Sequence, residues 1–560
     1  MPIYEQFIGR HRDQFATLED LQKNYRVSYP DTFNFAYDVL DVLAARTPDK
    51  LAMLWVSNEG EERRFTFDDM SRLSNKAANF FTSRGIGKGD YVMLVLKRGY
   101  EFWYCMMGLH KIGAVAVQAT HLLTSKDYVY RMNAGRIKMI VLTGDGDCTD
   151  HVDEALDQYE TLESRCVTRG KKAAGWIDFD VEFEKQSDSW TRPVGEADTR
   201  VTDPMIMSFS SGTTGYPKMV VHDFSYPLGH LMTGVFWHRV EDGGLHFTIS
   251  DTGWLKSLWG KMYGQWLGES AVFTYDFEKF HAVDILEKIA QYKVTTFCAP
   301  PTMYRFMIKE DFSPYDLSSL RHCCTAGEAL NPEVYNQWLR NTGHKIFEGF
   351  GQTETTLVCS TLYPWMQPRL GSMGLAAPGY KVVVCDEKGD EVLSGITGEI
   401  CIRTDGYDAG KPLGLFRQYY RDQDATDRAW HDGLYHTGDT AYRDEMGFLW
   451  YVGRVDDVIK SSGYRIGPFE VESTLMEHEA VLECAVTGVP DPERGFAVKA
   501  TIVLCKGFVG TPELTKELQN YVKKTTAPYK YPRIIEYVDE LPKTISGKIR
   551  RVEIRERDSK

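Results

Sequence analysis

Apolar and polar positions in the first part of the chain follow two alternating periods. Residues 51–56 (LAMLWV) and 91–96 (YVMLVL) are short, continuous apolar runs that predict buried strands. Between them, apolar residues recur at helical spacing: Phe67, Met70, Leu73, Ala77, Phe80 and Phe81. Thr66 and Asp69 resemble a weak capping box at the start of that helix, and an aromatic-rich helix is expected over residues 100–109. Strands that alternate with helices predict a parallel sheet covered by helices, and so an α/β fold.

A second unit is expected towards the end of the chain. Residues 451–453 end a strand-like run, and the charged joint Arg-Val-Asp-Asp follows at residues 454–457. Beyond this joint lie two strand patterns and one helical pattern, over residues 485–489, 501–504 and 512–523. We therefore predict a large domain, residues 1–455, and a small α+β domain, residues 456–560.

The charge balance excludes some functions. The 560 residues include 65 Lys and Arg against 79 Asp and Glu, which gives a net charge of −14. This acidic balance argues against a protein whose main work is to coat nucleic acid or an anionic membrane. From Asp456 onward basic and acidic residues balance, so the negative charge belongs to the large domain, and the stretch from Lys506 onward is locally basic. A local basic site for a small anion remains compatible with these numbers.

The eleven cysteines are scattered, with no paired CxxC spacing. This pattern is typical of reduced thiols rather than of a disulfide scaffold or a zinc site. The first residues contain no apolar signal region, and no stretch approaches 18 uninterrupted apolar residues, so we expect neither a targeting segment nor a membrane span. These features predict a cytoplasmic protein.

The segment 208–218, SFSSGTTGYPK, has the composition of an anion-binding loop. Glycines let backbone N–H groups approach an anion, hydroxyl groups add hydrogen bonds, and Lys218 adds a positive charge. The spacing differs from the common nucleotide-triphosphatase loop, because only two residues separate Gly212 from Gly215. Taken alone, the segment is equally compatible with a flexible Ser/Gly turn.

Four further motifs change this interpretation: EGFGQTE at residues 348–354, YHTGD at 435–439, GRVDDVIKSSGYR at 453–465 and PKTISGKIRR at 542–551. With SSGTTGYPK they resemble, in order, the full signature set of the adenylate-forming superfamily of acyl-CoA synthetases, adenylation domains and luciferase-like enzymes. SDTGWLKSLWG at residues 250–260 and CTAGEALNPE at 324–333 are most similar to medium-chain acyl-CoA synthetases. The resemblance covers nearly the whole chain. It implies a large domain of helix-covered mixed β-sheets with a β-barrel-like subdomain, and a small, mobile C-terminal domain.

The resemblance also implies a two-step reaction. A carboxylate and ATP give an acyl-adenylate and pyrophosphate, and coenzyme A then displaces AMP to give a thioester. The first step brings two anions together, so it needs preorganised positive charge. ATP, Mg²⁺ and coenzyme A are the expected cofactors and co-substrates.

By the same resemblance, residues of the Ser/Gly loop hold the β- and γ-phosphates: Ser210, Ser211, Gly212, Thr213, Thr214, Gly215 and Lys218. Glu354, with Thr214 or Thr213, would position Mg²⁺, a cation that prefers oxygen ligands. Asp439 would accept hydrogen bonds from the ribose hydroxyls, with Arg454 in support. The remaining nucleotide residues are expected on two turns: Gly327, Glu328, Ala329, Glu348, Gly349, Phe350, Gly351, Gln352 and Thr353.

Lys548 is the implied catalytic residue of the first step, where it would bridge the carboxylate and the α-phosphate. The basic run around it is otherwise typical of a solubilising tail or a nucleic-acid patch. For the second step, the resemblance assigns coenzyme A to the loop Ser462, Gly463, Tyr464 and Arg465, where a side chain at Gly463 would obstruct the thiol. Lys548 and Gly463 cannot both occupy one site, so the small domain must rotate, with Asp456 as the hinge.

The acyl pocket is the least constrained part of the site. Acetate-specific relatives carry tryptophan at the position of Gly351, so glycine there implies an open tunnel for longer acids. Plausible walls are Trp237, Trp254, Lys256, Trp259 and Cys298, although ordinary core packing explains the tryptophans equally well. Lys256 departs from the family pattern, and a buried lysine is costly unless it is paired or neutral.

We therefore predict an AMP-forming acyl-CoA synthetase for a short-to-medium-chain acid, straight or branched. The alternatives are an aryl-CoA ligase, a free-standing adenylation enzyme that loads a carrier protein, and a degenerate nucleotide-binding protein. The expected partners are a small carboxylic acid, ATP and coenzyme A, with no nucleic acid. The oligomeric state stays open, a homodimer being one alternative.

Overall fold

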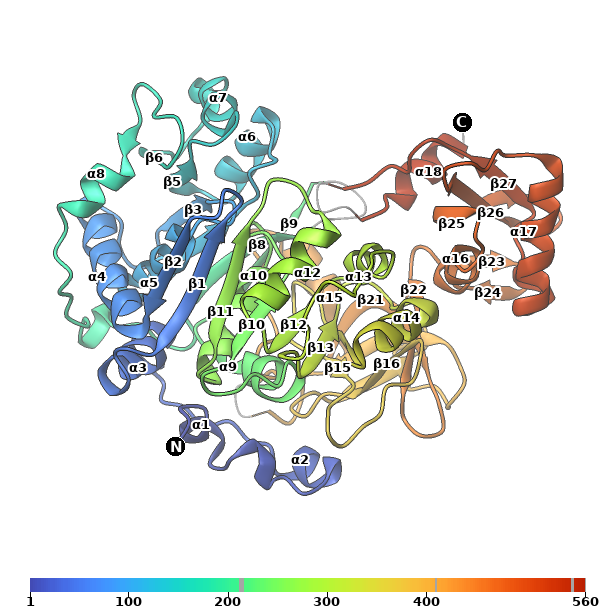
Figure 1. Cartoon of the computed structure of the whole chain (residues 1–560), viewed down its shortest axis with the longest axis horizontal. Coiled ribbons are helices and arrows are strands. Elements are labelled where there is room, and N and C mark those ends of the chain that lie inside the picture. The colour runs from blue at the N-terminus through green and yellow to red at the C-terminus, as the bar shows by residue number, and fades with distance from the viewer. Residues whose placement is uncertain (211–215, 408–409, 545–547, 559–560) are drawn as a thin grey trace.

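A computed structural model describes residues 1–210, 216–407, 410–544 and 548–558. Five residues of the expected phosphate loop lie outside the described residues: Ser211, Gly212, Thr213, Thr214 and Gly215. The strands of the described residues form three sheets, two in the large domain and one in the small domain (Figure 1).

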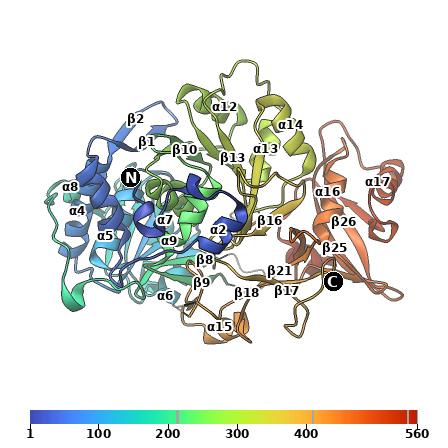
Figure 2. The same ribbon diagram turned by 90° about the horizontal axis from the view of Figure 1, so that it is seen from below.

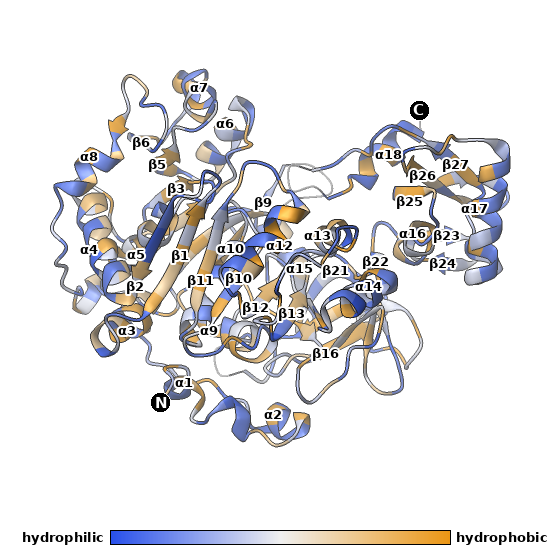
Figure 3. Cartoon of the chain, in the orientation of Figure 1, coloured by the Kyte–Doolittle hydropathy of each residue, from blue (hydrophilic) through white to orange (hydrophobic). Residues whose placement is uncertain are grey.

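The first sheet has 14 strands among the described residues, and its strand pairing changes from parallel to antiparallel along its length. Its parallel part runs through β1 (Leu51–Ser57), β11 (Ala271–Asp276), β10 (Leu245–Thr248), β12 (Thr296–Cys298), β13 (His322–Thr325) and β14 (Ile346–Phe350). The edge strand β2 (Glu62–Thr66) is antiparallel and largely polar (Figure 3), as suits an exposed edge. Helices α12 (Ala282–Gln291), α13 (Pro301–Met307) and α14 (Pro332–Thr342) connect the parallel strands.

Beyond β14 the same sheet becomes antiparallel. It continues through β15 (Cys359–Ser360), β16 (Ser372–Ala376), β22 (Leu449–Arg454), β21 (Leu434–Arg443), β18 (Gly398–Arg403) and β17 (Val382–Cys385), with β20 (Trp430–His431) paired to β21. The expected large domain of mixed β-sheets is confirmed, but its barrel-like subdomain does not close in the described part of the chain. Over the described residues these strands are an open extension of the large sheet, because β14 pairs directly with β15.

The second sheet has eight strands in the described part of the chain. Its parallel strands are β8 (Pro204–Ser210), β4 (Val115–Gln118), β3 (Tyr91–Val95), β5 (Ile137–Thr143), β6 (Ser164–Thr168) and β7 (Ile177–Asp178), and β9 (Lys218–Asp223) and β19 (Gln418–Tyr419) are antiparallel at the other end. The expected parallel sheet with helical cover is confirmed. Helix α4 (Phe67–Ser83) starts with the expected capping box of Thr66 and Asp69.

Helix α5 (Glu101–Ile112) shows where the core sits. All of its residues are buried, which is typical of a helix enclosed on every side. Its aromatic and sulfur-containing side chains belong to the largest hydrophobic cluster, together with residues of α4 and of the segments α9 (Tyr226–Leu231), η5 (Met232–Trp237) and α11 (Tyr263–Leu267). A buried polar residue near its end is paired: the amine of Lys111 donates a hydrogen bond to Oδ1 of Asp41 over 2.8 Å.

The small domain has its own sheet and core. Strands β24 (Tyr464–Ile466), β23 (Ile459–Ser461), β26 (Gly495–Leu504) and β25 (Val481–Asp491) pair in that order, with β27 (Ile534–Tyr537) added to β26. Helices α16 (Pro468–Met476), α17 (Pro512–Thr525) and α18 (Arg551–Asp558) pack on it. Both ribbon views place this unit at one end of the molecule (Figures 1 and 2). Among the described residues, no helix has both the length and the apolar character needed to cross a bilayer.

Candidate active site

The site residues of the large domain gather where the parallel part of the first sheet gives way to its antiparallel part. Strand β14 ends at Phe350, and the next residues turn towards β21 and β22. On those strands Asp439 and Arg454 are direct cross-strand partners, so the register itself places an acid beside a base. The turn after β14 contributes Gln352 to the same place.

Asp439 is the most constrained carboxylate of the site. It is 6% exposed, Nε2 of Gln352 donates a hydrogen bond to its Oδ2, and the hydroxyl of Tyr451 donates to Oδ1 over 3.2 Å. NH1 of Arg454 lies 3.4 Å from Oδ2 and also donates to the Thr437 carbonyl over 3.1 Å. Burial raises the pKa of Asp439, and Arg454 opposes that rise. The carboxylate therefore sits in a preorganised position, with its partners already in place.

Glu354 lies a short way along the same turn. Its Oε1 accepts a hydrogen bond from the Tyr419 hydroxyl over 2.8 Å, and the amine of Lys218 lies 4.6 Å from the centre of the Tyr419 ring. Burial raises the pKa of Glu354, while Tyr419 and Lys218 lower it. Ser210 and Lys218 are cross-strand partners at the ends of β8 and β9, on either side of the five residues that lie outside the description. A carboxylate, an amine and the mouth of the Ser/Gly loop thus converge, and a hard cation with phosphate ligands would fit this donor chemistry.

Burial and close packing explain why Glu348 and Gly349 occupy the end of β14. Glu348 is 7% exposed, its Oε1 is 3.5 Å from the Leu330 N–H, and burial raises its pKa to about 8. A Cβ at Gly349 would stand 2.7 Å from the Trp237 indole, so glycine is required for this packing. Phe350 packs near Tyr451, with ring centroids 6.5 Å apart, and the Thr353 carbonyl accepts from His222.

The second predicted turn, Gly327, Glu328 and Ala329, follows β13. Gly327 has a φ of +105°, which favours glycine, and a Cβ there would meet nothing within 4 Å. Oε2 of the exposed Glu328 accepts a hydrogen bond from the Thr302 hydroxyl over 2.7 Å. The turn is therefore an open, partly exposed rim.

Lys548 of the small domain faces this site. Its positive charge lowers the pKa of Asp439 and also that of Lys256, so both groups lie within its electrostatic range. Its own backbone is fixed by Thr544, which donates its N–H to the Lys548 carbonyl over 2.7 Å and accepts the Lys548 N–H at its hydroxyl over 3.1 Å. The side chain itself is exposed. Asp439, Lys256 and Lys548 therefore belong to one region.

The predicted coenzyme A loop lies elsewhere. Ser462 and Gly463 form the tight turn between β23 and β24, with φ values of +50° and +83°. Tyr464 stacks on Tyr529, and Arg465 pairs with Glu387 of the large domain at 2.6 Å. A Cβ at Gly463 would meet nothing within 4 Å, so in this arrangement the turn faces open space.

Asp456 stands between the two domains. Its Oδ1 lies 3.7 Å from Nε of Arg454, and the neighbouring N–H groups of Asp457 and Val458 donate back to the Arg454 carbonyl. Beyond it the domains touch through side chains, as where the Asn331 amide donates to the Ser473 carbonyl over 3.3 Å.

Four of the predicted pocket residues come together. Trp237 and Trp259 have ring centroids 6.2 Å apart, and the amine of Lys256 lies 5.4 Å from the Trp259 ring and 3.4 Å from the Ala326 carbonyl. Burial lowers the pKa of Lys256, and Cys298 is near enough to oppose that shift. Trp254 lies in the turn before α10 (Lys256–Lys261), and among the described residues no ring contact joins it to the other two indoles.

Gly351 has a backbone reason to be glycine. A Cβ there would lie 2.3 Å from the Thr356 carbonyl oxygen, closer than real Cβ atoms approach. The residue is exposed, at the start of the turn that carries Gln352 and Glu354. A larger residue at position 351 would therefore first displace this turn, before it reaches an acyl chain.

Sequence reasoning missed the tyrosines that orient the predicted side chains. Tyr419 donates to Glu354, Tyr451 to Asp439, and Tyr435 to Oε1 of Gln352 over 2.8 Å. It also missed His238, which stacks on Trp237 and Trp259 at 4.6 and 5.7 Å and whose pKa burial lowers far below the usual value. Tyr435 begins the motif YHTGD and Tyr451 lies just before the motif at 453–465, so both could have been found by asking what holds a buried carboxylate. His238 and Tyr419 lie in no motif.

Comparison with known proteins gives a consistent family. The model of AMP-binding enzymes matches residues 40–420, and the model of the AMP-binding enzyme C-terminal domain matches residues 470–548. Acyl-coenzyme A synthetase ACSM3, mitochondrial, from Mus musculus is 38% identical over 99% of this chain and 96% of its own. The Rattus norvegicus protein named ACSM5, mitochondrial, is 40% identical over 97% of this chain and 93% of its own.

Solved structures agree with this assignment. The anthranilate CoA ligase AuaEII, in complex with anthranoyl-AMP, has a TM-score of 0.86 and 28% identity, and the match covers 95% of this chain and 98% of that one. The Brucella canis acyl-CoA synthetase has a TM-score of 0.72 and 31% identity over 97% of this chain and 99% of its own. The resemblance seen in the motifs is confirmed.

Proposed function

This chain belongs to the AMP-binding enzyme family, and from that premise we infer that it is an AMP-forming acyl-CoA synthetase for a short-to-medium-chain carboxylic acid. It is an acid–thiol ligase that uses ATP and coenzyme A. The observation that carries the substrate-activating role is the buried Asp439, held by Gln352 and Tyr451, within the electrostatic range of Lys548. The chain length and branching of the acid are the finer part of the proposal.

We assign the nucleotide to the junction of the two parts of the large sheet. Asp439 would accept the ribose hydroxyls, and Arg454 would keep that carboxylate ionised despite its burial. Lys218 and the Ser/Gly loop would bind the terminal phosphates. The exposed rim at Gly327 and Glu328 would border the base.

Mg²⁺ fits Glu354. Its carboxylate is oriented by the Tyr419 hydroxyl and lies near Lys218, so one acidic group faces the region that phosphates would occupy. When bound, the ion would neutralise phosphate charge and favour attack on the α-phosphate. The second proposed ligand, Thr214, lies outside the described residues.

We propose that the described arrangement of the domains is the one that forms the acyl-adenylate. Lys548 acts electrostatically on Asp439 and Lys256, which border the nucleotide and the acid, whereas Gly463 faces open space. Rotation about Asp456, near the proposed boundary between residues 1–455 and 456–560, would withdraw Lys548. It would bring Ser462, Gly463, Tyr464 and Arg465 to the site for coenzyme A.

The acid would enter between Trp237, Trp259, Lys256 and Cys298. Large aromatic walls and a half-buried amine leave room for a compact chain better than for a long one. Trp254 and Gly351 are retained as proposed contributors. For Gly351, the proximity of the Thr356 carbonyl gives a competing backbone explanation.

The main alternative within this chemistry is an aryl-CoA ligase. It is favoured by the match to an anthranilate CoA ligase at a TM-score of 0.86. A carrier-loading adenylation enzyme would form the adenylate and ignore free coenzyme A. The retained Asp439, Arg454, Glu354 and Lys548 argue against a degenerate binding protein.

One panel tests these alternatives. Release of AMP and of pyrophosphate is measured for straight acids from acetate to decanoate, for branched acids such as 2-methylbutyrate and for benzoate, with and without coenzyme A. We expect coenzyme A-dependent turnover with a maximum among short-to-medium acids. A maximum at benzoate would favour the aryl-CoA ligase, and pyrophosphate release without dependence on coenzyme A would favour carrier loading.

The compartment is proposed only as one that keeps thiols reduced. All eleven cysteines are free. The expectation of a cytoplasmic protein is not confirmed, because the relatives named above are mitochondrial. Fractionation of cells that express the full chain, followed by immunodetection, distinguishes cytoplasm from mitochondrion.

A further inference from the structure

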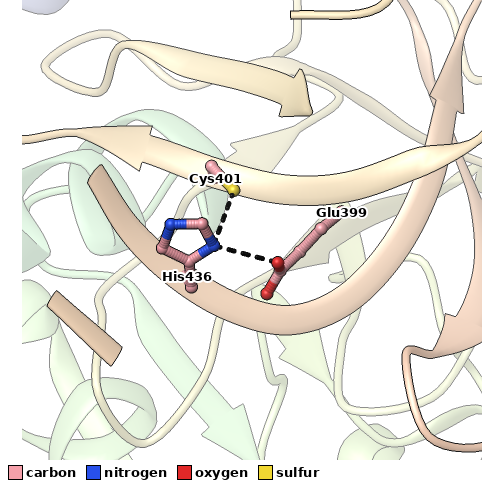
Figure 4. Close-up of side chains that lie close together, drawn as sticks. All are labelled: Glu399, Cys401 and His436. Carbon is pink, nitrogen blue, oxygen red and sulfur yellow. Dashed lines mark hydrogen bonds and ion pairs between the residues drawn. The ribbon is translucent and has the colours of Figure 1, made fainter. Parts of the chain in front are cut away.

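Strands β17, β18 and β21 bring four side chains that can bind a metal onto one face. Glu399 and Cys401 are two residues apart on β18, so both point to the same side of the sheet. Cys385 on β17 is the cross-strand partner of Glu399, and His436 on β21 is the partner of Cys401. Figure 4 shows Glu399, Cys401 and His436 converging across two adjacent strands.

The atoms that could bind an ion are close together. Nδ1 of His436 lies 2.9 Å from Oε2 of Glu399 and 3.5 Å from Sγ of Cys401, and one ligand atom from each of the three residues lies within 4.8 Å of the others. Cys401 is fully buried, and Cys385 on the neighbouring strand is 2% exposed. A nitrogen, a carboxylate oxygen and one sulfur thus surround one point, and Cys385 lies on the adjacent strand opposite Glu399.

These separations suit a small tetrahedral ion. With Zn–S of about 2.3 Å and Zn–N and Zn–O of about 2.1 Å, tetrahedral angles place N and S about 3.6 Å apart and N and O about 3.4 Å apart. The observed N–S separation of 3.5 Å matches, and the observed N–O separation of 2.9 Å requires an opening of about half an ångström. The mixed N, O and S donor set selects zinc over magnesium or calcium, which prefer oxygen alone.

We propose that Glu399, Cys401 and His436, with Cys385 as the fourth ligand, form a binding site for Zn²⁺ or a similar thiophilic divalent cation. Binding replaces the thiol protons of the cysteines, which are released to solvent. The imidazole proton of His436 moves from Nδ1 to Nε2, so Nδ1 supplies its lone pair to the metal. No oxidation or reduction is involved.

Surrounding groups already hold the ligands in place, as is usual at metal sites. The Gly438 N–H donates to the other carboxylate oxygen of Glu399 over 2.7 Å. The His436 ring stacks on His431, with centroids 3.8 Å apart and planes 14° apart. Access is available, because the side chains of His436 and Glu399 are 12% and 21% exposed.

The proposed metal site lies next to the turn that positions Asp439, so a bound ion would affect the active site. Gly438 directly precedes Asp439 and has a φ of +69°, and a Cβ there would collide with the Arg454 guanidinium at 2.7 Å. The turn that aims Asp439 is therefore pinned by Glu399, one of the proposed ligands. A bound cation that fixes this carboxylate should stabilise both the antiparallel end of the sheet and the turn.

Cobalt substitution tests the site without relying on activity. The full-length protein is treated with a chelator, kept in a phosphine reductant and excess Mg²⁺, and titrated with Co²⁺. We expect one Co²⁺ per chain, with a thiolate-to-cobalt charge-transfer band in the near ultraviolet and intense visible bands typical of tetrahedral cobalt. Zn²⁺ should displace the cobalt and raise the melting temperature.

Matched variants identify the ligands. Cys401→Ser and His436→Gln should weaken Co²⁺ at least about ten-fold and abolish the zinc-dependent rise in melting temperature. Cys505→Ser, at the most accessible cysteine of the chain, should leave both unchanged. Cys385→Ser should weaken the charge-transfer band without removing it. The absence of a thiolate band, or a band of undiminished intensity in Cys401→Ser, would overturn the proposal. Melting of each apo variant shows whether it folds.

Discussion

The two domains hold their charged site residues in different ways. Asp439 belongs to the large domain and Lys548 to the small domain, and both are proposed to act on the nucleotide. Asp439 is buried, and both of its oxygens accept hydrogen bonds from side chains of the same domain. Lys548 is exposed and is fixed through its backbone by Thr544. A group that must remain in one place is preorganised by neighbours, whereas a group that must leave after the first step cannot be tied to the other domain.

Removing the charge on the movable side tests this contrast most strongly. Lys548→Ala should lower acyl-adenylate formation by about 10³-fold, because positive charge at the reacting phosphate is lost. Thioester formation from supplied acyl-adenylate should be nearly unchanged. Pyrophosphate exchange and single-turnover thioesterification measure the two steps separately.

Lys543→Ala is the matched control, because Lys543 lies on the same tail but pairs with Glu483 at 2.8 Å. It should retain both half-reactions. An equal loss of both half-reactions in Lys548→Ala would refute the assignment of this residue to the first step.

Fixing the joint should separate the half-reactions in another way. The described hydrogen bonds at the joint use the N–H groups of Val455, Asp457 and Val458, so a proline at position 456 breaks none of these. Asp456→Pro should therefore keep pyrophosphate exchange and lower thioesterification by about 10²-fold through restricted rotation. Full turnover in this variant would eliminate the hinge at Asp456.

On the preorganised side, a milder change is expected to have a smaller effect. Asp439→Asn keeps an acceptor for Gln352 but loses the charge that faces Arg454. Because charge-assisted hydrogen bonds are about twice as strong as neutral ones, the KM for ATP should rise about ten-fold. The exposed Asp432→Asn serves as a control in steady-state assays. An unchanged KM for ATP would remove Asp439 from the nucleotide site.

A contrast between local patterns and long-range pairing explains which parts of the fold the sequence could predict. Periodicity identified the helix at α4 with its Thr66–Asp69 cap and the strands β1 and β3, because local burial patterns govern these elements. Motif order identified the family. The fold class is confirmed, but the expected barrel-like subdomain is open over the described residues. Closure depends on pairing between strands far apart in sequence, which no local pattern encodes.

Residues in the candidate site divide similarly. Asp439, Arg454 and Gln352 lie in motifs and do come together. Tyr419 and His238 reach the site through tertiary packing and leave no local signal. Spacing also pointed away from a zinc site, since the proposed ligands Cys385, Cys401 and His436 lie on three strands and meet only through sheet register.

Glu348 offers the smallest expected effect on turnover and a pH signature instead. Its folded-state pKa is raised by burial to about 8, above its unfolded value of 4.5. The carboxyl therefore stabilises the fold fully below pH 4.5, and this contribution is lost as the pH rises towards 8. Glu348→Gln keeps a neutral side chain of similar shape, so it should unfold at a higher denaturant concentration than wild type at pH 8.5, but not at pH 5. Denaturant titrations at both pH values measure this, with the exposed Glu59→Gln as control. A pH-independent difference would mean that burial does not raise the pKa of Glu348 in the folded protein.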